Sequence, residues 1–451
     1  MQQNIKKEKD IIQLSDHFNY SRLIRFVMPS IVMMVFTSMY SIVDGLFVIN
    51  FAGSSQFAAI NLIMPLLIIL GAVGFMLGAG GTAIVAKTLG MKKDELANEY
   101  FSLLVYVTAA VGAFIALVGI IFARQVSALL GAQGQTLEYC TVYARIVLIA
   151  LPCFMLQNVF QSLFITAEKP KLGLYVTVAA GLTNIVLDAL LVGVFRLGLE
   201  GAAFATALSQ CVGGIVPVIY FARPNTSLLR LGKTKLYGRM LIDTCVNGSS
   251  ELMSNISMSV VTIFYNFQLM HFAGERGISA YGVIMYVSFF FVSIFIGFAI
   301  GSSPIVSYHF GADNRDELKN LRKRSLSIVL ITGAAMTALA LLLTVPICKL
   351  FAGSDPDLYA LTLRGFLIFS FSYLFTGVNI FGSAFFTALN NGVISAVISF
   401  LRTLLFQCVM VTVLPIFFDI DGVWFSVIAA EILSLAVTVA FLVAKRKKYG
   451  Y

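Results

Sequence analysis

Charged residues are scarce in this chain: Asp, Glu, Lys and Arg make up 12% of its 451 residues, whereas hydrophobic residues make up 59%. A typical soluble domain carries about 25% charged residues. A soluble fold of this composition would leave large apolar surfaces in water, so the composition indicates lipid as the solvent. We therefore expect a membrane protein.

Residues that carry chemistry are also scarce. The three histidines are scattered at predicted membrane edges, without the clustering that an enzyme site needs. The six cysteines lie in or beside apolar runs without metal-ligand spacing, so we interpret them as reduced packing residues. These residues are His17, His271 and His309, and Cys140, Cys153, Cys211, Cys245, Cys348 and Cys408. We predict no enzymatic activity, no cofactor and no structural metal.

A phosphate-binding loop is missing too. The nearest match ends in Gly232-Lys233-Thr234, but Ser227 stands where the first glycine of the motif should be. This argues against an ATP-driven pump. The first twenty residues are polar and lack the short apolar core of a cleavable signal peptide, so the first helix is expected to act as its own insertion signal.

Long apolar runs, in contrast, recur from end to end. Four examples are Ile24 to Ile49, Tyr100 to Ala123, Leu172 to Phe195 and Ser325 to Leu350. Each is long enough to cross a hydrocarbon core of about 30 Å as a helix. The runs do not alternate with period two, as barrel strands do. We predict an all-α membrane protein with twelve transmembrane helices.

The basic residues indicate an orientation. The net charge of +9 would suggest a nucleic-acid partner in a soluble protein, but 24 of the 31 Lys and Arg fall in alternate segments that would share one side. Six fall on the other side, and Arg402 lies within a span. The positive-inside rule then predicts that both termini and the basic run Arg223 to Arg239 are cytoplasmic, in a bacterial inner membrane, without a nucleic-acid partner.

Short motifs recur in the same order in the two halves of the chain. The offset is 221 for Phe51-Ala52-Gly53 with Phe272-Ala273-Gly274, for Thr166-Ala167 with Thr387-Ala388, and for Glu200-Gly201 with Asp421-Gly422; it is 222 for Asp94-Glu95-Leu96 with Asp316-Glu317-Leu318. Six spans per copy place both copies in the membrane the same way round. We predict an N-terminal lobe at 1–222, a cytoplasmic linker at 223–244 and a C-terminal lobe at 245–451.

Glycine pairs with small-xxx-small spacing occur in the second span and in its repeat. They are Gly74 with Gly78 and Gly297 with Gly301. We interpret them as positions of close helix packing.

Four carboxylates lie inside predicted spans, at Asp44, Asp188, Glu251 and Glu431. Each costs at least ~2.5–3.5 kcal/mol near the bilayer centre, so each needs a reason to persist. Asn184 and Asp188 share one helix face, and Pro29 is placed to kink the helix that carries Asp44. Such acids can hold a sodium ion or share a proton. The plainer alternatives are helix capping or pairing with Arg402 or Arg145.

At this point the residues resemble a known family. The motifs Thr166-Ala167-Glu168-Lys169-Pro170 and Asn184-Ile185-Val186-Leu187-Asp188 are similar to the pattern of the multidrug and toxic compound extrusion (MATE) transporters, most like its bacterial branch. The likeness covers nearly the whole chain; further matches are Pro29, Asp44, Gly198, Gly201-Ala202-Ala203, Ala205-Thr206, Ser250-Glu251-Leu252, Pro304, Tyr308, Gly311-Ala312 and Asp421-Gly422-Val423-Trp424.

The resemblance implies two six-helix lobes forming a V, and antiport of amphipathic, often cationic, drugs against sodium or protons. It assigns a cation site in the N-terminal lobe, a hinge at Pro29, and a C-terminal-lobe acid at Glu251. Some relatives carry a second C-terminal-lobe aspartate where this chain has Asn379, the repeat partner of Asn158, so the N-terminal lobe is the expected cation site. Its implied members are Asp44, Tyr143, Asn184, Asp188 and Thr206, and the implied substrate cleft contains Glu251, Asn158 and Asn379.

Two other functions fit a two-lobe membrane fold. A flippase for a lipid-linked saccharide would favour a cleft rich in arginine, whereas this chain offers mainly acids. A receptor without transport would show no cation-dependent flux. We expect an exporter of small amphipathic organic molecules that contacts membrane lipids and acts as a monomer.

Overall fold

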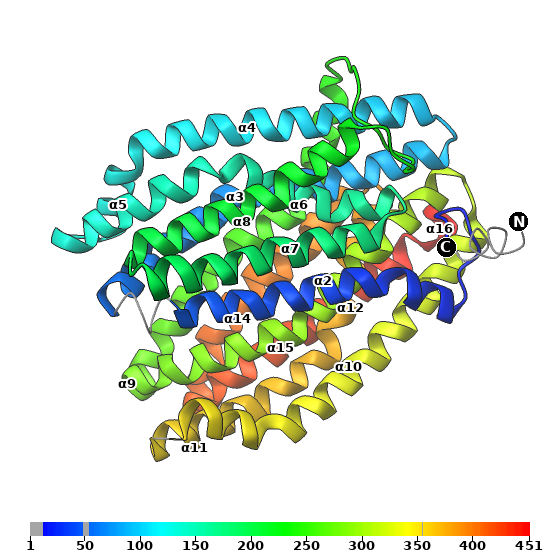
Figure 1. Cartoon of the computed structure of the whole chain (residues 1–451). Coiled ribbons are helices and arrows are strands. Elements are labelled where there is room, and N and C mark those ends of the chain that lie inside the picture. The colour runs from blue at the N-terminus through cyan, green and yellow to red at the C-terminus, as the bar shows by residue number, and fades with distance from the viewer. Residues whose placement is uncertain (1–11, 48–53, 354) are drawn as a thin grey trace, which may run out of the picture.

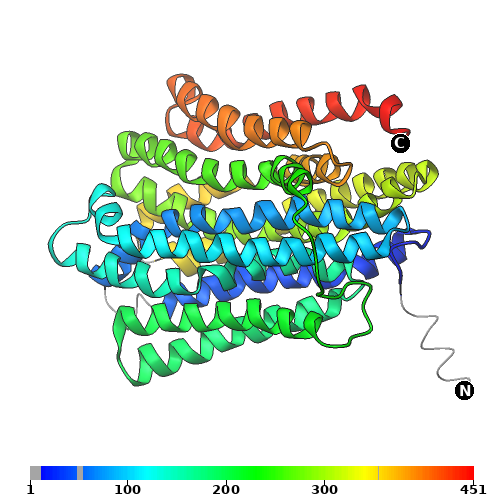
Figure 2. The same ribbon diagram turned by 90° about the horizontal axis from the view of Figure 1, so that it is seen from above.

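The computed structural model describes residues 12–47, 54–353 and 355–451, and the described part is helical without strands. The N-terminal half contains α2 (Tyr20–Phe47), α3 (Ser54–Gly90), α4 (Asp94–Leu129), α5 (Gly134–Ile149), α6 (Leu151–Thr166), α7 (Pro170–Leu187), the π-helical turn η2 (Asp188–Val194) and α8 (Gly198–Ala222). In Figure 1 and Figure 2 the long helices run in roughly one direction, as expected of a membrane-spanning bundle.

The C-terminal half repeats this series. It contains α9 (Gly238–Gly311), α10 (Arg315–Ala352), α11 (Pro356–Phe369), the 3₁₀ turn η3 (Ser370–Ser372), α12 (Tyr373–Ala388), α13 (Gly392–Phe400), the π-helical turn η4 (Leu401–Leu405), α14 (Phe406–Val413), α15 (Pro415–Ala444) and α16 (Arg446–Tyr449). Because α9 begins at Gly238, it starts inside the segment 223–244 predicted as a linker.

The predicted twelve crossings are present in the described chain. Ten stretches are long and apolar enough to span a membrane, and α5 with α6, bent by 54°, makes a further broken span. The 74-residue α9 holds two crossings, since Gly274 (φ 60°, ψ −149°) interrupts its helical backbone. Only a residue without a Cβ adopts such a backbone at low cost.

The backbone confirms the internal duplication. Residues with positive φ occur in matching loops of the two halves: Lys92 with Asp313 and Gly198 with Asp419, each 221 apart, and Glu168 with Asn390, 222 apart. The Phe51-Ala52-Gly53 member of the sequence repeat lies outside the described residues.

One repeat match is out of register. The residue before α4 is Lys93 and the residue before α10 is Asn314, which places the true offset of these helices at 221. Gly112 and Gly333 confirm it, because a Cβ on them would meet Pro152 and Tyr373, which are also 221 apart. The match of Asp94-Glu95-Leu96 with Asp316-Glu317-Leu318, at 222, is therefore shifted by one residue. Packing fixes the register of a helix, and these exposed acids at the helix starts contribute little to packing.

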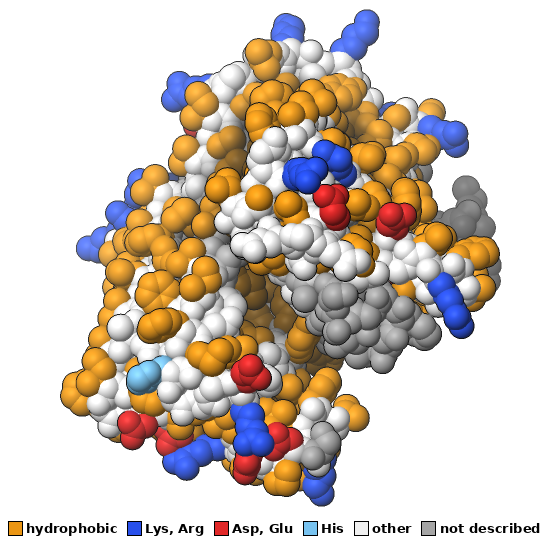
Figure 3. Space-filling model, turned by 90° about the vertical axis from the view of Figure 1, so that its left-hand side faces the viewer, with side chains coloured by type: hydrophobic (Ala, Val, Ile, Leu, Met, Phe, Trp, Pro, Cys, Tyr) orange, Lys and Arg blue, Asp and Glu red, His pale blue; other side chains and the backbone are white. Residues whose placement is uncertain are grey.

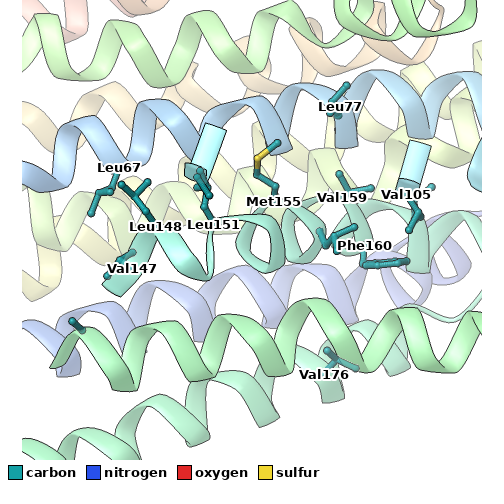
Figure 4. Close-up of a cluster of buried hydrophobic side chains, with 14 of the residues drawn as sticks. Leu67, Leu77, Val105, Val147, Leu148, Leu151, Met155, Val159, Phe160 and Val176 are labelled. Atoms are coloured by element: carbon teal, nitrogen blue, oxygen red, sulfur yellow. The ribbon is translucent and has the colours of Figure 1, made fainter. Parts of the chain in front are cut away.

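Each half has its own apolar core. One cluster of buried side chains lies within residues 59–229 and packs α6 against α3 and α4; Figure 4 shows Met155, Val159 and Phe160 of α6 in this cluster. A second cluster lies within residues 261–427. A third joins the start of α2 to the C-terminal half. In Figure 1 the N-terminal half lies above and the C-terminal half below.

The two halves meet through reciprocal contacts of α3 and α9. A Cβ on Gly90 would lie 2.0 Å from the Tyr308 carbonyl oxygen, and a Cβ on Gly311 would lie 2.0 Å from the Lys87 carbonyl oxygen. Both members of each pair are 221 residues apart, as an axis relating the two halves requires. The lobes therefore touch at the end of the bundle where both described ends of the chain lie.

A strap of residues 12–19 crosses this same end. The Leu14 amide donates to Glu168 Oε1 at 2.7 Å in the N-terminal half. The Phe18 amide donates to Glu317 Oε1 at 2.9 Å in the C-terminal half. Leu14 and Phe18 are fully buried. The strap thus ties the two lobes together on the side where they already touch.

Candidate functional site

The N-terminal lobe brings together side chains from four helices. Asp44 lies in the last turn of α2, Tyr143 on α5, Asn184 and Asp188 at the end of α7, and Thr206 on α8. Asp44 interacts electrostatically with Asp188 and Asn184. The structure thus gathers the five residues that the resemblance assigned to a cation site.

Tyr143 lies at the centre of this cluster. It is buried, its hydroxyl lies beside that of Thr206, and it interacts with both carboxylates. Tyr40, one helical turn before Asp44, also interacts with that carboxylate. The sequence analysis missed Tyr40, although its i,i+4 spacing from Asp44 would have placed it on the same face.

Close packing of α2 on α7 holds the two carboxylates near each other. Gly181 provides the space, because a Cβ there would lie 2.5 Å from Phe36 and 3.0 Å from Tyr40. Asp188 then begins the π-helical turn η2. Single π-helical turns are rare and frequently mark functional sites, since they shift side chains out of the regular helical register.

The cluster carries unused acceptors. Among the described residues, neither carboxylate oxygen of Asp188 has a hydrogen-bond partner, and Asp44 Oδ1 has none. Asp188 is fully buried. Two carboxylates with an amide and two hydroxyl groups form an oxygen-rich donor set that suits a hard cation such as sodium, or a shared proton.

The repeat position in the C-terminal lobe is neutral. Tyr265 takes the place of Asp44, 221 residues later, and its hydroxyl is 2.8 Å from both Gln407 Oε1 and Ser426 Oγ. Its ring stacks on Tyr281 with the centroids 4.9 Å apart. This network is satisfied by hydrogen bonds and needs no cation, so the two lobes differ at equivalent positions.

A second charged cluster lies in the C-terminal lobe. Arg402, in the π-helical turn η4, donates from Nε to Glu431 Oε1 at 3.0 Å and from a terminal nitrogen to the same oxygen at 2.9 Å. Asn379 donates to Glu431 Oε2 at 2.6 Å. The alternative that Glu431 pairs with Arg402 is therefore confirmed, and Asn379 lies with this pair.

Glu251 and Asn158 lie apart from that pair. Glu251 on α9 is half-buried, and Arg402 is near enough to interact with it electrostatically. The sequence could not show this, because Arg402 comes from a helix 151 residues away. Asn158 on α6 and Asn379 on α12 are both buried. Pro29 lies inside α2 with a buried ring.

The end of the molecule opposite the strap is hollowed. Figure 3 shows this face, where a recess opens between the two halves beside the residues drawn in grey. Asp44, in the last turn of α2, and Asp188, at the start of η2, both lie toward this end. The N-terminal carboxylates are thus near the open side, while the lobes touch on the other.

Comparisons with known proteins agree with this geometry. The MatE family model matches twice, at residues 29–190 and 252–413, once in each half. The multidrug export protein MepA of Staphylococcus haemolyticus is 25% identical over 381 residues, which cover 82% of this chain and 83% of that protein. MepA of Staphylococcus saprophyticus is 24% identical over 438 residues, covering 93% and 94%.

Solved structures share the fold. A multidrug resistance MATE transporter in an outward-facing conformation superposes with a TM-score of 0.92 at 19% identity, covering 98% of both chains. A transporter of Pyrococcus furiosus, whose structure is described as having a binding pocket of reverse polarity, superposes with a TM-score of 0.90 at 19% identity, covering 96% of this chain and 98% of that one. With two family matches that span most of the duplicated bundle, the chain belongs to the MATE family of multidrug efflux transporters.

Proposed function

We propose that this transporter exports amphipathic, often cationic, organic molecules from the cytoplasm in exchange for sodium ions or protons, by alternating access. The observation that carries this proposal is the Asp44–Asp188 cluster, in which buried carboxylate oxygens have no partner among the described residues. Two close carboxylates in an apolar lobe are stabilised by a bound cation. The cation would therefore favour the arrangement that brings α2 and α7 together.

Glu251 is our candidate for contact with a cationic substrate. Arg402 already has a carboxylate partner in Glu431, so Glu251 adds a negative charge that no described side chain pairs with at salt-bridge distance. Glu251→Gln should weaken export of cationic dyes more than of neutral ones. An equal loss for both would indicate a role in folding. Asn158 and Asn379 are proposed as neighbours of the cleft.

Orientation follows from the basic residues. With 24 of the 31 Lys and Arg on the side of the strap, the positive-inside rule places that side, and both termini, in the cytoplasm of the inner membrane. The carboxylates near the hollowed face would then load cations from outside. Protease access to the linker at Arg230 in inside-out vesicles tests this orientation, and cleavage from the outer face would contradict it.

The alternative of a lipid-linked saccharide flippase is less well supported. An anionic lipid substrate would need unpaired basic residues in the cleft, and the intramembrane Arg402 is paired. The decisive experiment is dye efflux from proteoliposomes under separately imposed sodium and proton gradients. Efflux under either gradient supports exchange for that cation. No response to either would contradict the proposal.

A further inference from the structure

A basic pocket lies outside both sites, at the strap end of the bundle. It occupies about 470 Å³ between the start of α10 and the short helix α16. Its lining is Lys319, Arg322, Lys323, Leu326, Ser327, Leu330 and Arg446. The lining thus combines four cations with two leucines.

The positive charges in this pocket are poorly balanced. No acid belongs to the lining, and Lys319 pairs only with the exposed Asp316, at 3.7 Å. Arg322 lies over the Tyr451 ring at 5.2 Å from its centroid, and its Nε has no hydrogen-bond partner among the described residues. Arg446 faces Arg322 as a like charge. An anion bound between them would relieve this repulsion.

The duplicated half shows what fills the equivalent groove. Lys319 and Lys323 correspond, at the offset of 221, to Asn98 and Ser102 on α4. There the linker covers the helix: the Arg230 amide donates to Asn98 Oδ1 at 2.6 Å, and the Gly232 amide donates to Ser102 Oγ at 3.0 Å. The N-terminal groove is therefore occupied by backbone.

The C-terminal groove is open at the corresponding level. Lys323 is exposed, and Leu330, two helical turns further along α10, is 53% exposed. Moving along α10 from Lys319 to Leu330, the lining changes from charged to apolar as the helix passes into the membrane-spanning bundle. A ligand that fits this order has an anionic group at one end and a hydrocarbon chain at the other.

We propose that this groove binds an anionic phospholipid, with the phosphate among Lys319, Arg322, Lys323 and Arg446 and an acyl chain along Leu326 and Leu330. Basic pockets beside membrane helices are suited to such headgroups. The apolar half of the groove distinguishes a lipid from free phosphate. The bound lipid would take the place that the linker has in the other lobe and would hold α16 against α10.

The test measures thermal unfolding of the purified full-length protein in neutral detergent, titrated with phosphatidylglycerol, phosphatidylcholine or inorganic phosphate. Phosphatidylglycerol should raise the melting temperature at concentrations where the other two do not. The Lys319→Gln/Lys323→Gln variant, with both changes at exposed sites, should bind phosphatidylglycerol about 30-fold more weakly.

A matched control removes the same charge elsewhere. Lys233 and Lys235 are exposed in the linker, so Lys233→Gln/Lys235→Gln should leave the affinity for phosphatidylglycerol unchanged. Arg446→Gln, a single change on α16, should weaken binding about fivefold and serves if the double variant fails to fold. Wild-type affinity in both pocket variants, or an equal response to phosphatidylcholine or to inorganic phosphate, would overturn the proposal.

Discussion

At the scale of single residues, the two lobes use charge in opposite ways. The N-terminal lobe holds acids whose oxygens lack partners, while the C-terminal lobe pairs Glu431 with Arg402 and Asn379. A buried ion pair is weak evidence for stability, but a buried charge that has lost its partner is costly. The C-terminal pair is therefore expected to be structural, and the N-terminal acids are free to bind a cation.

Removing Arg402 alone should destabilise the protein. In Arg402→Gln the carboxylate of Glu431, whose side chain is 5% exposed, keeps its charge but loses its cationic partner. The expected cost is roughly 3–5 kcal/mol, measured as a lower melting temperature in detergent. The double variant Arg402→Gln/Glu431→Gln should recover part of this loss. A single variant as stable as the wild type would show that the pair is not structural.

Docking of the strap should depend on pH through Glu168. Burial raises the pKa of this carboxyl above its ordinary value, despite the hydrogen bond from the Leu14 amide. A raised pKa means that the docked state prefers the protonated form, so docking is strongest at acidic pH and weakens as the pH rises through the raised pKa.

Hydrogen exchange of the Leu14 amide measures this effect, with each rate divided by the intrinsic rate at the same pH. The protection of this amide should fall from mildly acidic to mildly basic pH in the wild type. In Glu168→Gln, which cannot ionise, protection should stay constant over the same range. A wild-type profile that is flat, or that rises with pH, would contradict the assignment.

At the scale of helices, the packing of α2 on α7 sets the distance between the two N-terminal carboxylates. Gly181→Val should push α2 away through Phe36 and Tyr40, because even a Cβ at Gly181 lies within 3.0 Å of both rings. We expect a folded protein whose gradient-driven export falls at least tenfold. Gly193→Val is the control, since a Cβ there meets nothing within 4 Å. Equal export by the two variants would exclude this packing role.

Most of the helices could be predicted from the sequence, because apolar runs of the length of a membrane leave few alternatives. The carboxylates were found for the same reason, since a charge such as Asp188 is conspicuous in a run of apolar residues. What could not be predicted depends on contacts between distant segments. Examples are the pairing of Arg402 with Glu431, the strap on Glu168, and the linker on Asn98.

At the scale of the whole molecule, the lobes touch at one end and part at the other. The reciprocal contacts of Gly90 with Tyr308 and Gly311 with Lys87 lie on the strap side, and the hollow lies opposite. Two related lobes that rock against each other expose a central site to each side in turn. Reversal of the present state requires both the glycine contacts and the strap to separate.

Cation binding near Asp44 would bias that reversal. Binding brings α2 and α7 together, so release of the cation favours a rearrangement, and Pro29 gives α2 a place to bend. The substrate and the cation then compete through the conformations that they prefer. Asp44 and Asp188 should act as one unit, so a variant lacking both carboxylates should be scarcely worse than either single variant.

The most direct measurement is dye export by Asp44→Asn in proteoliposomes, under a sodium gradient and separately under a proton gradient. The variant should remain folded and should bind dye with an affinity close to that of the wild type, because the substrate cleft is intact. Export driven by either gradient should be lost. Export at the wild-type rate under both gradients would contradict a coupling role for the N-terminal carboxylates.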